Sequence, residues 1–336
     1  MQDASAAGPA GDFDTGPPFV FGFGFNNGAA EEMRWEDAAA AKSSYDWIWL
    51  HLNMNNDEAR SWIHAQEDIP YAARSALLAG ETRPRVSSFE NGLVVNLRGV
   101  NLNEGAEPED MVSIRIWFSK NQVITTRRRR LKAAQDIRSE IIENGLQLSA
   151  PGVLVARIAS RLTERMTPFV EQIEDRVDEI EDEVLSASGD GVRPRLAEAR
   201  HDAVMVRRFI APQRDALTRL AQDESTLFDA TTRIDLRETA DQVTRLTEEI
   251  DAARERAMVL QDQLTDQRAE EMNRNMMVLS IVAAIFLPLG FLTGLFGINV
   301  GGMPGVEDPA AFWLVVFACG VIGALLLVIF RMMKWL

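Results

Sequence analysis

The sequence predicts an α/β domain, a long α-helical stalk and two transmembrane helices in a chain of 336 residues. Two uncharged apolar stretches near the C-terminus, 276–296 and 311–330, are each long enough for a helix to cross the hydrocarbon core of a bilayer. A continuous helical pattern precedes the first stretch, and strand-like segments occupy the N-terminal part. We therefore divide the chain into a large soluble part and a small membrane part.

The α/β domain is expected over residues 31–145, after a mobile tail over 1–30 that is rich in Gly, Pro and Phe. That tail lacks the basic start and apolar core of a signal peptide. Residues 45–54 alternate aromatic and aliphatic side chains as a strand does, and 57–66 have a helical composition. Lys120 and Asn121 are placed like a hairpin turn among the further predicted strands. Those strands cover 86–90, 93–98, 111–119 and 122–127.

A helical region is expected over 146–232, because apolar residues recur at three- and four-residue steps over 153–185. The segment 186–194 breaks the pattern, and a second helix over 195–222 is expected to return antiparallel. The stalk helix, 233–275, carries a heptad seam and meets no Pro or Gly before the first span. The seam consists of Leu236, Val243, Leu246, Ile250, Ala253, Ala257, Leu260 and Leu264.

Composition excludes several classes of function. The net charge of −15 argues against nucleic acid as a partner, because phosphate binding needs a basic face.

The run 127–130 is interpreted as solvated charge, with a docking patch as the alternative. His51 and His64 are interpreted as packing or surface residues, and the single cysteine, Cys319, excludes an intrachain disulfide. No phosphate loop or nucleophile elbow occurs, so no enzyme is predicted.

Basic residues flank both spans, whereas the outer loop over 300–310 has no Lys or Arg. By the positive-inside rule both termini, including the end 331–336, are expected to be cytoplasmic. Glu307 and Asp308 in the loop would attract cations to the outer mouth. Two helices cannot enclose a water-filled path, so we expect an oligomer.

One face of the first span, 276–299, is predicted to line such a path. Its positions recur at steps of three, four or seven residues: Asn273, Met276, Ala283, Leu287 and Gly294, with Leu279 beside them. The apolar members would form constrictions that gate by dewetting.

Other positions extend this prediction. Asp262 and Asp266 would ring a vestibule below the span, or are ordinary surface carboxylates. Pro288 is expected to bend the helix, as a structural feature or a hinge. Gly290, Gly294 and Gly297 are expected to serve close helix packing. Asn299 would present a ring of carboxamides that weakly holds a hydrated cation, or would cap the helix after Gly297.

These motifs support a family resemblance. Leu287-Pro288, the segment 291–299 (FLTGLFGIN), the loop 301–305 (GGMPG) and the end 334–336 (KWL) together resemble the CorA superfamily of two-span cation transporters. The tripeptide Gly297-Ile298-Asn299 stands where magnesium channels carry Gly-Met-Asn, and the loop is similar to the ZntB zinc-transporter branch. The resemblance implies a homopentameric funnel in the inner cell membrane, with this tripeptide as its signature.

The leading hypothesis is therefore a divalent-cation transporter, zinc first, with proton coupling implied by the ZntB resemblance and no cofactor beyond the transported ion. A magnesium or cobalt channel is the alternative within transport, and a membrane-tethered scaffold or sensor is the alternative outside it. The predicted stripe holds no Cys or His, so it offers no tight zinc site. The spans hold no carboxylate or His, so coupling would need Glu307, Asp308 or cytoplasmic groups.

Overall fold

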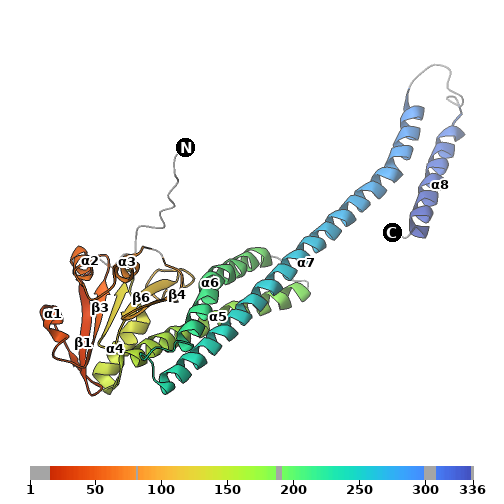
Figure 1. Ribbon diagram of the computed structural model, residues 1–336. Helices are drawn as coiled ribbons and strands as arrows, with labels where there is room; N and C mark the ends of the chain where they lie inside the picture. The colour runs from red at the N-terminus through yellow and green to blue at the C-terminus, as the bar shows by residue number, and fades with distance from the viewer. Residues whose placement is uncertain (1–15, 81, 187–190, 299–307, 334–336) are drawn as a thin grey trace. The chain divides into compact units, whose positions relative to one another are not determined.

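The computed structural model describes residues 16–80, 82–186, 191–298 and 308–333. Contacts along the chain divide it into two compact units, Met1–Leu260 and Gln261–Leu336, and each is described separately. The first unit contains a mixed sheet and its covering helices, and the second contains the membrane hairpin (Figure 1). The expected combination of an α/β domain, a long helix and two apolar helices is confirmed.

The first unit is built on a seven-stranded sheet in the order β2-β1-β3-β7-β6-β5-β4. Only β3 and β7 pair in parallel among the described strands, and the other neighbours are antiparallel. The predicted hairpin between β6 and β7 is present, because the Ser119 amide donates to the Gln122 carbonyl at 2.9 Å. The strands are β1 (Phe19–Asn26), β2 (Ala29–Glu32), β3 (Trp47–Asn53), β4 (Arg85–Phe89), β5 (Gly92–Gly99), β6 (Val112–Phe118) and β7 (Gln122–Arg127).

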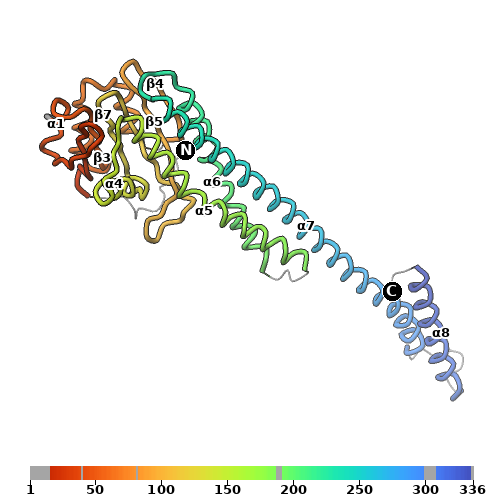
Figure 2. The backbone as a smooth tube through the Cα atoms, turned by 90° about the horizontal axis from the view of Figure 1, so that it is seen from below, coloured from red at the N-terminus to blue at the C-terminus, as the bar shows by residue number. Residues whose placement is uncertain are grey.

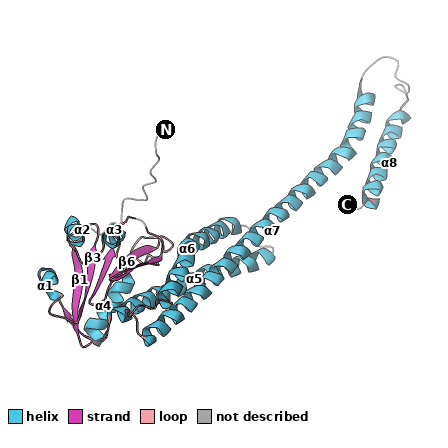
Figure 3. Cartoon of the chain, viewed as in Figure 1, coloured by secondary structure: helices cyan, strands magenta, loops and turns pink. Residues whose placement is uncertain are grey.

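Side chains that alternate along the central strands fill two apolar layers. Ile48 and Leu50 of β3 pack under α2 (Asp57–His64) and α3 (Tyr71–Leu78) on one face. The opposite face meets α4 (Lys132–Asn144) and α5 (Pro151–Leu185), as Figure 3 shows. A short η1 (Trp35–Asp37) and α1 (Ala38–Ala41) precede β3.

The expectation of a mobile tail over 1–30 is wrong for residues 19–30, which form β1 and the start of β2. Phe21, Phe23 and Phe25 point to one face and are almost fully buried. On the other face Gly24 leaves room for the Tyr45 ring, since a Cβ there would lie 2.5 Å from that ring. The α/β domain therefore starts before residue 31. The part of the predicted tail over 1–15 lies outside the described residues.

Three helices continue the first unit. α5 and α6 (Val192–Ala221) pack against each other, and the first part of α7 (Ala230–Gly297) joins them through ion pairs (Figure 2). All eight residues of the predicted heptad seam on α7 are buried. The predicted stalk over 233–275 is thus divided, since its residues to Leu260 belong to the compact first unit.

The predictions for four polar residues of the first unit can be compared with their burial in the structure. His51 is buried with its Nδ1 atom 2.8 Å from Thr125 Oγ1, and His64 is exposed, as expected for packing and surface residues. Arg127 contradicts the interpretation of 127–130 as solvated charge, because it is the last residue of β7 and only 5% exposed. Arg130 is exposed.

The second unit contains the rest of α7 and α8 (Ala310–Met332). Each helix includes an 18-residue window that is apolar enough to cross a membrane, and almost none of that window is buried. The predicted spans 276–296 and 311–330 fall inside these two helices. α7 remains helical through Pro288, so the proline does not end the first span.

Candidate ion-conduction path

One face of α7 packs against α8. Ile281 is buried, and Ile285, Pro288 and Leu292 are half-buried at positions one, two and three helical turns further on. Their spacing of four, seven and eleven residues from Ile281 places them on one side of the helix. Figures 1 and 2 both show α8 beside this part of α7.

The matching face of α8 has the same period. It is formed by half-buried side chains and one buried phenylalanine: Val315, Cys319, Ile322, Leu326 and Phe330. Cys319 is a half-buried packing residue at this face. The two spans therefore associate through apolar side chains of ordinary size.

The predicted stripe lies on a different face of α7. At about 100° per residue, Leu287 projects about 120° away from Ile281 and about 160° away from Ile285. The stripe residues are exposed in the single chain. They are Asp262, Asp266, Asn273, Met276, Leu279, Ala283, Leu287 and Gly294.

The angles around α7 also show which of the predicted stripe residues lie on the same side of the helix as Leu287. Asp262, Asp266 and Asn273 project within about 60° of Leu287, whereas Leu279 projects about 80° from it. Asp262 and Asp266 thus share a side of α7 with the constriction residues, rather than the side that faces α8. Ala269, which the sequence reasoning did not name, also falls on this side.

Glycines of the spans make no close contact within the chain. A Cβ added at Gly290, Gly294 or Gly297 would meet nothing within 4 Å, and the same holds for Gly320 of α8. The close helix packing expected of these glycines does not occur between α7 and α8 of one copy. Their small-residue faces remain open to other helices in a membrane.

Pro288 changes the hydrogen bonding of α7 without breaking it. Proline has no amide hydrogen, so the carbonyl of Ala284, four residues earlier, loses its usual helical partner. One turn further on, the Thr293 hydroxyl donates to the carbonyls of Leu289 and Gly290 at 3.0 and 3.2 Å. Near mid-span the helical hydrogen bonding therefore lacks one backbone donor, at Pro288, and gains a side-chain donor, the Thr293 hydroxyl.

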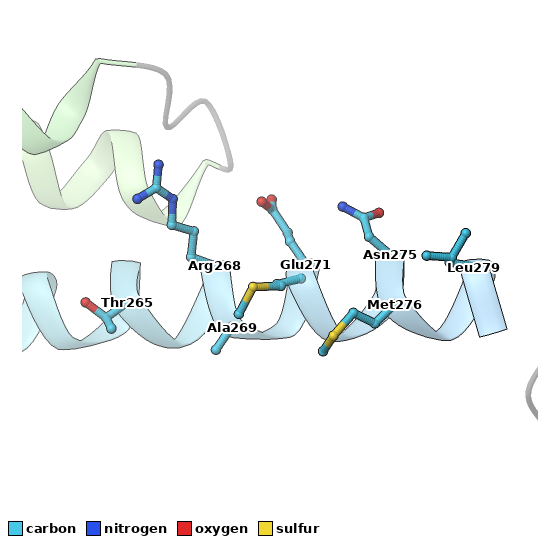
Figure 4. A pocket seen from close by; sticks show the side chains of 8 residues that line it. Thr265, Arg268, Ala269, Glu271, Asn275, Met276 and Leu279 are labelled. Carbon is cyan, nitrogen blue, oxygen red and sulfur yellow. The ribbon is translucent and has the colours of Figure 1, made fainter.

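A shallow open groove follows α7 just before the first span (Figure 4). Thr265, Arg268 and Glu271 provide its polar rim, and Ala269, Met272 and Met276 provide apolar surface. Met276 and Ala269 also belong to the stripe side. All of the lining residues come from this single helix, so the groove encloses no path by itself.

The outer end of the hairpin is only partly described. Gly297 ends α7 and Ile298 is exposed just beyond it, while Asn299 and Glu307 lie outside the described residues. Asp308 is exposed, and its Oδ1 atom accepts a hydrogen bond from the Ala310 amide at 2.9 Å. Asp308 therefore stabilises the first turn of α8, a role that sequence reasoning missed although an acidic residue before a helix is typical of it.

Protein metal ligands are not gathered anywhere in the described part of the chain. No group of three His, Cys, Asp or Glu side chains there is arranged to hold a metal ion. The stripe offers amide, carboxylate and apolar groups instead. Such a surface suits a hydrated cation that passes, rather than one that is bound tightly.

Comparison with known proteins gives this arrangement a context. A family model described as "CorA-like Mg2+ transporter protein" matches residues 44–332, which is most of the chain. The chain belongs to the CorA family. As a member of this family it is a membrane ion transporter with two spans and not an enzyme.

Two curated CorA-family relatives show where the chain lies within the family. It is 38% identical over 293 residues to the divalent cation transporter CmaX of Pseudomonas aeruginosa, covering 86% of this chain and 87% of CmaX. It is 33% identical over 267 residues to the zinc transport protein ZntB of Pectobacterium carotovorum, covering 79% and 80%. The resemblance to the ZntB-like branch of the CorA superfamily is thereby confirmed.

Solved structures agree with the CorA-family fold. The structure of full-length CmaX has a TM-score of 0.81 and 34% identity, covering 96% of this chain and all of that one. The ZntB cytoplasmic domain of Vibrio parahaemolyticus has a TM-score of 0.65 and 25% identity, covering 75% and 99%. The CorA magnesium transporter of Methanocaldococcus jannaschii shares the fold, with a TM-score of 0.78 at 20% identity.

Proposed function

We propose that this CorA-family protein transports divalent metal cations, zinc first among them, through a central pore of a homopentamer. The observation that carries the proposal is the separation of faces on α7. One side of the helix packs against α8, while the side bearing Leu287 and Asn273 is exposed in the single chain. Five such sides around an axis would enclose a path that two helices cannot enclose.

Each part of the stripe has a chemical role in this proposal. Asp262 and Asp266 concentrate cations on the cytoplasmic side, because grouped carboxylates lower the local potential. Met276, Leu279 and Leu287 form apolar constrictions that hold back water and ions until they widen. Gly297, Ile298 and Asn299 form the selectivity signature at the outer end, where Asn299 weakly holds a hydrated ion. The cation is cargo, and the function needs no bound cofactor.

The membrane arrangement follows from charge. In this proposal both termini lie in the cytoplasm, since basic residues such as Arg274 and Arg331 lie at the inner ends of the spans. The location in the inner membrane is what the family resemblance implies. Coupling to protons depends on groups outside the spans, because the described parts of the two spans contain no carboxylate or histidine. Glu307 and Asp308 in the outer loop are the nearest such groups in the sequence.

A magnesium or cobalt channel is the second candidate. It is favoured by the family model that matches the chain and by the lack of Cys or His on the stripe. Zinc is favoured by the 33% identity to ZntB and by the GGMPG loop. A membrane-tethered scaffold has no observation in its favour now that the family is known.

The test is metal uptake by proteoliposomes containing the purified full chain, comparing zinc, magnesium and cobalt with an inward proton gradient present or absent. We expect zinc uptake that rises with the gradient. Magnesium uptake that ignores the gradient would replace the zinc assignment with the channel assignment. No uptake of any of the three ions by folded protein would overturn the transport proposal as stated.

A variant pair tests the signature residue. Asn299→Leu removes the amide proposed to hold the hydrated ion, so we expect uptake to be lost. Gln267→Leu removes a carboxamide at an exposed position about 160° around α7 from Leu287 and should leave uptake near the wild-type rate. Equal uptake by both variants would show that Asn299 does not form the mouth.

A further inference from the structure

The groove beside the first span contains two exposed methionines on consecutive turns of α7. Met272 is 60% exposed and Met276 is 52% exposed, and both line the groove drawn in Figure 4. Residues four apart on a helix are neighbours, with about 5 to 6 Å between their Cβ atoms. Among the exposed methionines of the described residues, only these two have that spacing; the others are Met258, Met277, Met332 and Met333.

Packing within the chain does not account for this pair. The buried heptad seam of α7 ends at Leu264, and the side that packs against α8 begins at Ile281. Every residue of α7 between these two positions is exposed. In the single chain, the two thioether sulfur atoms can therefore be reached by a ligand that enters the groove.

The chemistry of the thioether limits which ligand this can be. Thioether sulfur is a soft, polarizable and uncharged donor that favours copper(I), whereas hard cations such as Mg²⁺ prefer oxygen. Methionine is unbranched and has three rotatable bonds, so two methionines one turn apart can turn their sulfur atoms toward a single ion. Thioethers are a separate class of donor from His, Cys, Asp and Glu, for which the described residues hold no metal cluster.

The charged residues of the groove offset each other. Arg268 lies one turn before Met272, and Glu271 is the residue next to it in the sequence. Around the helix, Arg268 projects about 80° and Glu271 about 140° from Met276. Because the two charges are opposite, the groove neither strongly attracts nor strongly repels a monovalent cation. Selection at the methionine pair therefore depends on the softness of its donors.

We propose that Met272 and Met276 form a binding site for a soft monovalent metal cation, copper(I) or its analogue silver(I). The two thioethers of one chain hold the ion from consecutive turns of α7. Met276 also lies on the stripe side of α7, about 20° from Leu287. In the homopentamer of the proposed function, on which this consequence rests, the bound ion lies at the cytoplasmic end of the path and blocks divalent cations.

The first test is silver binding by the full chain in detergent, measured by equilibrium dialysis against silver nitrate in chloride-free buffer. The chain carries Cys319→Ala, so that no thiol competes for silver. Met272→Leu and Met276→Leu should each raise Kd at least about tenfold, since even outer-shell partners of metal sites contribute this much. A large excess of Zn²⁺ should not displace the silver. Leucine nearly keeps the volume of methionine, so both variants should fold.

Met277→Leu in the same background is the matched control. Met277 is 38% exposed and projects about 140° from Met272 and 100° from Met276, so it cannot complete the pair. Its Kd should equal that of the Cys319→Ala chain. Unchanged silver binding in both the Met272 and Met276 variants would overturn the proposal. An equal loss in Met277→Leu would do the same, since it would indicate unspecific binding by exposed methionines.

The second test measures inhibition of zinc uptake by silver nitrate in proteoliposomes, each chain relative to its own uptake without silver. We expect silver to inhibit the Cys319→Ala chain and its Met277→Leu variant alike, and Met276→Leu to need at least about tenfold more silver. Silver that binds through the pair and leaves uptake unchanged would overturn the block. A chain that takes up no zinc would overturn the proposed function alone, because dialysis still decides whether the site exists.

Discussion

Ile281 and Leu287 project from different sides of α7: Ile281 is 6% exposed beside α8, and Leu287 is 74% exposed. Their six-residue separation corresponds to about 120° around the helix. A single hairpin can bury only one of these sides. The other must be covered by lipid, by neighbouring copies or by an aqueous path, and the following predictions distinguish these possibilities.

Leu287→Ala tests the apolar constriction. If five Leu287 side chains narrow the path, shortening them lowers the barrier to hydrated ions, and we expect basal uptake to rise on the order of tenfold, equivalent to about 1.4 kcal/mol in the barrier. Zinc uptake by proteoliposomes measures this change. Leu325→Ala on the exposed surface of α8 is the control and should leave the rate unchanged. Equal rates for all three proteins would place Leu287 against lipid.

The double variant Asp262→Asn and Asp266→Asn tests the vestibule. Removing these carboxylates lowers the local cation concentration, so we expect transport to fall on the order of tenfold at low ionic strength and by less at high salt. Initial rates across a salt series provide the measurement. Glu271→Gln, about 140° or more around α7 from both aspartates, is the control for a lost negative charge. A salt-independent effect would argue for a structural role instead.

Because His51 is buried, we predict that the free energy of unfolding of the first unit falls at acidic pH. Burial, with a smaller effect of Arg127, holds the pKa of His51 well below 6.5, so the folded protein keeps this histidine neutral. The unfolded chain takes up the proton, and stability therefore falls as pH drops below about 6.5, by up to about 1.4 kcal/mol per pH unit. His51→Asn should flatten Tm between about pH 6.5 and 5, whereas His64→Asn, at an exposed site, should not.

The ion pair between Asp251 and Arg207 is predicted to give a smaller loss of stability, at lower pH. The hydrogen bond from Arg207 of α6 lowers the pKa of the Asp251 carboxyl below 3.8, partly offset by burial. This stabilisation is present above about pH 3.8 and is lost as pH falls through the folded-state pKa. Both side chains are more than a third exposed, so we expect Asp251→Asn to cost only about 0.5 kcal/mol near neutral pH.

The control for this pair is Asp241→Asn, at an exposed position of the same helix. It removes the same charge without removing the Arg207 interaction, so its Tm should match the wild type across the pH range. If the two variants behave alike, the ion pair between α6 and α7 contributes nothing measurable.

Long periodic patterns made most helices predictable. The apolar positions of α5 and the heptad seam of α7 each extend over many turns. The residues at these positions are buried in the structure, as the helical period predicts. The prediction of a mobile tail where strand β1 lies was wrong for a physical reason. Gly22 and Gly24 suggested flexibility, whereas their lack of a Cβ admits the rings of Phe19 and Tyr45 beside the strand. The alternating phenylalanines 21, 23 and 25 were the pattern that would have identified the strand.

The polar core of the sheet was beyond sequence reasoning. Arg115 and Asn96 occupy strand positions where apolar residues are usual, and only the register of β5 and β6 shows that they are opposite each other. The stripe on α7 was accessible from helical spacing alone, because a helix fixes the angle between residues. Its assignment as a pore remains a prediction, since the surfaces that would face it belong to other copies.

Cys319 on α8 has a practical consequence. It is the only thiol in the sequence, and a half-buried position against α7 tolerates a small substitute such as alanine. A single exchange therefore yields a chain on which any newly placed cysteine is the sole target for a water-soluble thiol reagent. Moving that cysteine one residue at a time from 276 to 296 would trace which sides of the first span meet water, independently of any transport assay.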